Sequence, residues 1–141
     1  MHDSWGGVRM ISEDVDYSIR IIRAIFNNGE DKPIDAKMIL KSEDIPILTL
    51  YRLLRKLCAN NILTFNKEDG KTYMLNVSLD TISLRTIVEV IDGKIYINKC
   101  TRYVSNCSNC LKGCKVNREL LEIEKEIYKL LSRKSIRQIL E

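Results

Sequence analysis

The order of the regular elements constrains the fold of this chain most, because three helical segments directly precede two short strands joined by a polar turn. The first helix is predicted between Ser12, which can cap its start, and Gly29, which can end it. The second starts after Asp35, and the third runs from Pro46 to about Asn60. In the first and third segments apolar residues recur every three or four positions, which indicates helices that pack on a core.

The two strands are predicted over residues 62–65 and 73–76, on either side of the polar turn Lys67–Lys71. Gly70 in that turn tolerates a positive φ angle. Three helices followed by a hairpin is the order of a winged helix-turn-helix, in which the third helix enters the major groove of DNA and the hairpin lies against the backbone or the minor groove. The expected fold is therefore mainly α, with a small two-stranded β wing.

The outward side of the third helix would carry side chains suited to DNA contact: Thr49, Tyr51, Arg52, Arg55 and Lys56. Such side chains read bases and bind phosphates, and Lys67 and Lys71 would add cations at the wing. A solvated basic face explains the same pattern equally well. The net charge of +4 permits nucleic-acid binding but does not require it.

Four of the five cysteines fall within fifteen positions, at Cys100, Cys107, Cys110 and Cys114. Thiolates this close together on a loop can converge on one soft metal centre. The chain has no signal-peptide pattern and no apolar run long enough to cross a bilayer, so we expect a cytoplasmic protein without a membrane partner. There, such a cluster binds a metal or is redox-active more often than it forms disulfides. Free thiols are the alternative, and the spacing alone does not separate zinc from iron–sulfur.

An enzymatic role is not expected. The only histidine is His2, in an N-terminal stretch without periodicity, whereas serine and cysteine hydrolases use a positioned histidine base. Neither a phosphate-binding glycine loop nor a His-Glu metalloprotease motif is present. Residues 1–9 are expected to be a flexible extension ahead of a natural start at Met10.

A long helix is predicted after the last cysteine, with an apolar seam that advances by alternating threes and fours through Val116, Leu120, Ile123, Ile127 and Leu130. This spacing is typical of a helix that packs on a partner helix, so we expect a homodimer. The chain would then divide into the extension (1–9), a winged helix-turn-helix DNA-binding domain (10–93), a cysteine loop (94–114) and a dimerisation helix with a C-terminal turn (115–141).

Several stretches together resemble the Rrf-type family of winged helix-turn-helix bacterial transcription regulators. Residues 16–20 (Asp-Tyr-Ser-Ile-Arg) look like the first-helix signature of that family, residues 45–63 like its recognition helix, and residues 82–93 like the stretch before its cluster loop. The resemblance covers nearly everything from Met10 to the C-terminus. The wing departs from the family pattern, because it keeps one glycine and Tyr73 and adds acidic residues that weaken its attraction for phosphate.

The resemblance implies a repressor that binds a palindromic double-stranded DNA operator and follows the state of an iron–sulfur cluster, 2Fe–2S ahead of 4Fe–4S. Iron, redox or nitric oxide status would be the signal. All four clustered cysteines are expected to ligate the cluster. Asn117 stands at the position where a cluster-regulating member of the family has a histidine ligand. Asp16 is a less favoured substitute as a cluster ligand. The competing hypothesis is a zinc-stabilised structural or interaction module without regulated DNA binding.

Overall fold

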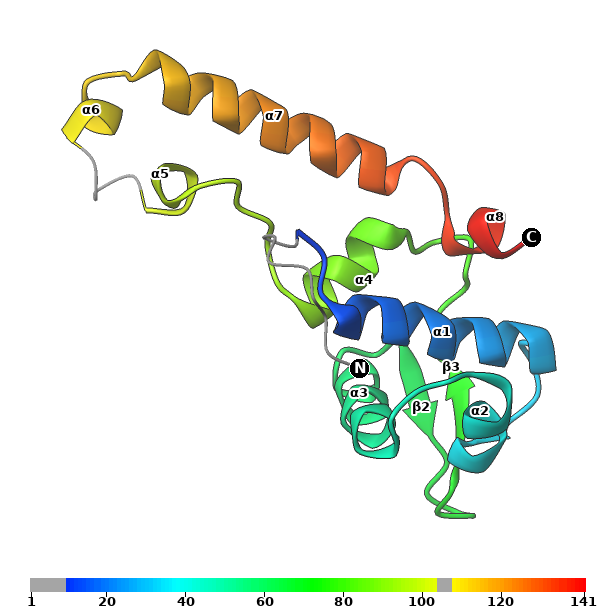
Figure 1. Cartoon of the computed structure of the whole chain (residues 1–141). Helices are drawn as coiled ribbons and strands as arrows, with labels where there is room; N and C mark the ends of the chain where they lie inside the picture. Colours follow the sequence, from blue (N-terminus) through cyan, green and yellow to red (C-terminus); the bar gives the residue numbers. More distant parts are fainter. Residues whose placement is uncertain (1–9, 104–107) are drawn as a thin grey trace.

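The structure, a computed structural model, describes residues 10–103 and 108–141. Residues 1–9, expected to be flexible, lie outside this description. Figure 1 shows the helices and the small sheet in their spatial arrangement, and their order is α1 (Glu13–Asn28), β1 (Ile34–Asp35), α2 (Ala36–Ser42), α3 (Ile47–Ala59), β2 (Leu63–Phe65), β3 (Thr72–Leu75), α4 (Leu84–Ile91), α5 (Lys99–Arg102), α6 (Ser108–Leu111), α7 (Lys115–Ser132) and α8 (Ile136–Leu140). The mainly α fold class is confirmed.

The first two helices begin where their capping residues predicted. The Ser12 hydroxyl accepts a hydrogen bond from the Val15 amide at 3.4 Å, and α1 ends at Gly29, whose φ is 113°. The Asp35 carboxylate accepts from the Met38 amide at 2.9 Å and starts α2. These bonds satisfy amides that a helix start would otherwise leave unpaired.

The sheet has one strand more than predicted. Its antiparallel strands lie in the order β1-β3-β2, with Leu63 opposite Leu75 and Ile34 opposite Tyr73. The additional strand, β1, is two residues long, which is too short to show an alternating pattern in the sequence. Gly70 takes a φ of 67° in the turn between β2 and β3, as its position predicted.

The core lies between α1, α3 and α4, which pack on one another, and α3 also packs on β2 of the sheet. Helix α3 contributes its four buried leucines, Leu50, Leu53, Leu54 and Leu57. The predicted stripe of α1 is also confirmed, since Val15, Ile22 and Ile25 are buried and the partly buried Ile19 and Phe26 pack against the same cluster. This core fixes which side of α3 faces outward.

Helix α7 lies along the outer edge of the molecule, away from the hairpin, and α8 returns to the winged part (Figure 1). Ile136 of α8 is fully buried, and its amide donates to the Ile82 carbonyl at 2.8 Å. The Arg137 guanidinium pairs with Glu30 and Asp80, each at 2.9 Å. The C-terminal end of α7 is therefore fixed to the winged part. Among the described helices, none is long and apolar enough to cross a membrane.

Candidate nucleic-acid interface and cysteine loop

The predicted DNA-binding side chains of α3 lie on the side of the helix away from its buried leucines. Thr49 is half-buried, and the other four are exposed: Tyr51, Arg52, Arg55 and Lys56. Two of these cations already have partners within the protein. The Arg52 guanidinium donates two hydrogen bonds of 2.9 Å to the Asp14 carboxylate, and the Lys56 ammonium donates to the Ile91 carbonyl at 2.7 Å. The hydrogen bonds from Arg52 hold the pKa of Asp14 below its usual value.

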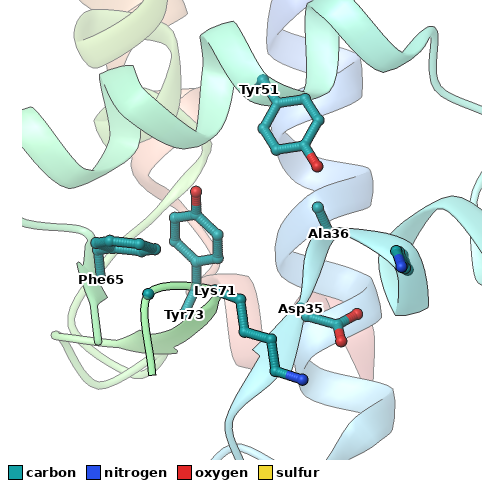
Figure 2. Close-up of a pocket in the computed structure, with 8 residues that line it drawn as sticks. Asp35, Ala36, Tyr51, Phe65, Lys71 and Tyr73 are labelled. Atoms are coloured by element: carbon teal, nitrogen blue, oxygen red, sulfur yellow. The ribbon is translucent and has the colours of Figure 1, made fainter. Parts of the chain in front are cut away.

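A hollow of about 230 Å³ separates α3 from the wing and the start of α2. Figure 2 shows Tyr73 directed from the wing toward α3, and Tyr51 directed from α3 into the same hollow. Two cations, Lys37 and Lys71, also line it. Burial raises the pKa of the Tyr73 phenol. Lys37 had not been expected here, because nothing in the local sequence distinguishes it from other surface lysines.

The acidic residue Asp69 holds the wing turn together. Its carboxylate accepts hydrogen bonds from the Lys71 and Thr72 amides, at 2.9 and 3.0 Å, and from the Thr72 hydroxyl. These bonds, led by the one from the hydroxyl, lower the pKa of Asp69. Both predicted wing lysines, Lys67 and Lys71, are exposed beside this turn.

The cysteine loop begins and ends at half-buried free thiols. Cys100 lies in α5, and Cys114 immediately precedes α7. Cys107 lies outside the described residues, and Cys110 belongs to α6, although the description does not extend to its side chain. The described side chains include no group of three or more potential metal ligands close together. These two thiols are the first and last of the four predicted ligands, and thiolates are the donor type of iron–sulfur clusters. Cys58, the fifth cysteine, packs against the core, and burial raises the pKa of its thiol.

One face of α7 holds the segment that leads into Cys100. The Tyr128 hydroxyl accepts from the Ile95 amide at 2.6 Å, and the Glu124 carboxylate accepts from the Ile97 amide at 2.8 Å. The Asn117 side chain donates to the Cys100 carbonyl at 3.1 Å. We call Asn117, Glu124 and Tyr128 the loop-holding face. The loop-holding face was not predicted, because polar residues at helical spacing are indistinguishable from a solvated face until their burial is known.

The predicted dimer seam lies on a separate face of α7, about a quarter turn around the helix from the loop-holding face. Val116 and Leu130 at its two ends are 67% and 63% exposed, and Ile123 at its centre is also exposed. Leu120 and Ile127 between them are half-buried. Ile127 also packs against the core of its own subunit, so the apolar side chains that the seam presents at the surface are mainly Val116, Ile123 and Leu130.

The end of α4, where the cysteine segment begins, is joined to both α1 and α3. The Ser12 amide and hydroxyl donate to the Asp92 carboxylate at 3.0 and 2.5 Å. Lys56 of α3 binds the carbonyl of Ile91, the last residue of α4. The outward helix α3 and the cysteine segment are thus both attached to one short helix end.

Comparisons with known proteins agree with this architecture. A family model described as Rrf2, iron-dependent transcriptional regulator, matches residues 11–141. No curated protein matches the chain in sequence.

Several solved structures share the fold at low sequence identity. CymR of Staphylococcus aureus is 15% identical with a TM-score of 0.67, covering 92% of this chain and 97% of that one. CymR of B. subtilis, described as the global cysteine regulator, is 18% identical with a TM-score of 0.72, covering 94% and 97%. IscR of T. potens is 16% identical with a TM-score of 0.69, covering 95% and 87%.

Proposed function

Because this chain belongs to the Rrf2 family, whose members are transcriptional regulators and not enzymes, we propose that it is a DNA-binding repressor controlled by an iron–sulfur cluster on its C-terminal cysteines. One observation carries the proposal: the segment leading into Cys100 is hydrogen-bonded to the same helix that presents the dimer seam. We place this activity in the cytoplasm, where thiolates stay reduced.

The DNA-binding surface consists of the outward side of α3 and the wing. Thr49, Tyr51 and Arg55 contact base edges, and Lys67 and Lys71 of the wing contact phosphates. Arg52 and Lys56 position α3 through their bonds to Asp14 and Ile91, in addition to any contact with DNA.

Two subunits associate through the α7 seam of Val116, Leu120, Ile123, Ile127 and Leu130. The exposure of Val116, Ile123 and Leu130 supports this, because a repeating apolar row on a surface helix gains stability by packing on a second helix. A two-fold dimer would set its α3 helices about 34 Å apart, one DNA turn, and would recognise a palindromic operator. Residues 10–93, 94–114 and 115–141 then act as DNA-binding domain, cysteine loop and dimerisation helix.

Cys100, Cys107, Cys110 and Cys114 hold the cluster, which we propose to be 2Fe–2S rather than 4Fe–4S. When bound, it links these thiolates in a manner that depends on iron supply, oxidation or nitric oxide. The loop-holding face transmits the position of the loop to α7, since Asn117 and Glu124 are buried and bond to its backbone. Through the α4 end, Lys56 and Ser12 connect the same segment to α3 and α1.

Operator affinity of three forms tests this proposal: protein purified without oxygen, protein stripped of metal, and a Cys100→Ala variant. We expect a brown protein containing iron and sulfide, and an affinity that differs between loaded and stripped protein by five- to a hundredfold, roughly the usual range of allosteric coupling. Equal affinity in all three forms, with the fold intact, would contradict regulation by the cluster. A colourless protein that contains zinc, and whose operator affinity is the same with and without the metal, would support the alternative of a zinc-stabilised module.

A further inference from the structure

The first turn of α3 exposes apolar side chains, and binding to DNA phosphates does not account for their exposure. Leu48, the second residue of the helix, is 83% exposed, the highest value among the exposed large hydrophobic residues of the described chain. Ile47 beside it and Tyr51 one turn later are exposed as well. Single exposed leucines are common on proteins, but a group of apolar side chains at one end of a helix marks a contact surface.

Leu48 lies in line with two of the proposed base-contacting residues, Tyr51 and Arg55. At 100° per residue, Leu48 and Arg55 lie nearly opposite the buried leucines of α3, and Tyr51 lies beside them on the same exposed side, so that the three form one stripe. This stripe changes from apolar at the start of the helix to cationic near its end. Tyr51 in the middle lines the hollow together with Lys37 and Lys71. The cations around the stripe are complementary to a polyanion, which favours DNA over a protein partner as its occupant.

The position of Leu48 in the helix determines what it would meet on DNA. The N-terminal residues of a recognition helix contact base edges in the major groove. Leucine has neither a donor nor an acceptor, so it cannot read the hydrogen-bonding pattern of a base pair. Thymine alone presents a methyl group in that groove, and apolar side chains recognise it by contact.

We propose that Leu48 is a specificity-determining residue that recognises a thymine methyl group in each operator half-site. This inference rests on the proposed function, because it requires that α3 enter the major groove. It adds an apolar contact to a surface whose other members act through hydrogen bonds and charge.

The test replaces thymine by deoxyuridine, which lacks only the methyl group and keeps the same hydrogen-bonding groups. Selection from random double-stranded DNA with the full-length protein first defines the operator. Each thymine of a half-site is then replaced in turn, and affinities are measured by fluorescence anisotropy. At one or two positions we expect the wild-type protein to lose about fourfold per methyl group, the value that corresponds to burying one such group. Leu48→Ala should bind thymine and deoxyuridine operators equally well at those positions.

Ile139→Ala is the matched control, because it truncates an exposed aliphatic side chain on α8, away from α3, and should keep the full preference for thymine. Circular dichroism should show an unchanged fold for both variants. Two results would overturn the role of Leu48 while leaving the proposed function intact. One is a wild-type operator affinity that no deoxyuridine replacement changes, and the other is a Leu48→Ala protein that keeps the preference for thymine. If selection enriches no sequence at all, the proposed function fails, and the role of Leu48 fails with it.

Discussion

At the scale of single residues, Arg52 and Arg55 lie one turn apart on α3 but have different surroundings. Arg52 is held by the Asp14 carboxylate, whereas Arg55 continues the outward stripe of Leu48 and Tyr51. A side chain that must leave an ion pair to reach DNA gains less from the contact than one that faces the groove already. The two arginines should therefore differ in their effect on operator binding.

We predict that Arg55→Ala weakens specific operator binding by about 1–3 kcal/mol, the usual loss when a base-contacting arginine is removed. Arg52→Ala should weaken binding less, and should lower the free energy of unfolding by less than about 1 kcal/mol, because its pair with Asp14 is partly exposed. Titrations with operator DNA and urea unfolding measure the two effects. Wild-type affinity in both variants would show that α3 is not the reading helix. An equal loss in both would show that the Asp14 pair opens when DNA binds.

At the scale of elements, α7 combines two tasks on two faces. The loop-holding face bonds to the backbone of the cysteine segment, and the seam faces outward. A change in the cysteine segment can therefore reach α7 through three side chains without touching the seam. This separation makes it possible to test the coupling independently of dimer formation.

We predict that Tyr128→Phe reduces the difference in operator affinity between cluster-loaded and stripped protein. The substitution deletes only the hydroxyl, which accepts from the Ile95 amide at 2.6 Å and donates to the Ile95 carbonyl at 3.4 Å. A single such bond contributes about 0.5–1.5 kcal/mol to net stability. Hydrogen exchange should show a less protected Ile95 amide. Tyr96→Phe is the matched control, because Tyr96 is an exposed neighbour on the same segment, and its removal of a hydroxyl should leave the affinity difference unchanged. An unchanged difference in Tyr128→Phe would mean that the loop-holding face is structural only.

The sequence predicted those elements whose signals are local. Helices α1 and α2 have side-chain caps, and α3 and α7 have long apolar periodicities, so the starts of all four, and the ends of α1 and α3, were confirmed within one or two residues. The two residues of β1 and the four of α5 are too few to produce a periodic pattern. The partners of Arg52 and Lys56 are 38 and 35 positions away, and such pairings depend on tertiary packing that no local pattern encodes. For the same reason the hydrogen bond from Asn117 to the Cys100 carbonyl was not predicted.

At the scale of the whole molecule, the two ends of α7 are attached differently. Its C-terminal end is fixed to the winged part through α8, where Ile136 is buried and Arg137 pairs with Glu30 and Asp80. At its N-terminal end, Asn117 bonds to the Cys100 carbonyl. Glu124 and Tyr128, farther along the helix, bond to the backbone of Ile97 and Ile95. In a dimer joined through the seam, the winged part would therefore follow the C-terminal end of α7, while Cys100 would act on the other end through Asn117.

The last prediction concerns the assembly that this arrangement requires. Ile123→Glu places a carboxylate at the centre of the seam, where two subunits would have to bury it without a partner. We expect the wild-type protein to sediment as a dimer at micromolar concentration and Ile123→Glu to sediment as a folded monomer that binds a palindromic operator far more weakly than the dimer does. Lys125→Glu is the control, because it introduces the same carboxylate on an exposed side of α7 about half a turn away from Ile123, and it should remain dimeric. If the wild-type protein is a monomer, the proposed recognition of a palindromic operator is wrong. If Ile123→Glu remains dimeric, the interface lies elsewhere on the subunit.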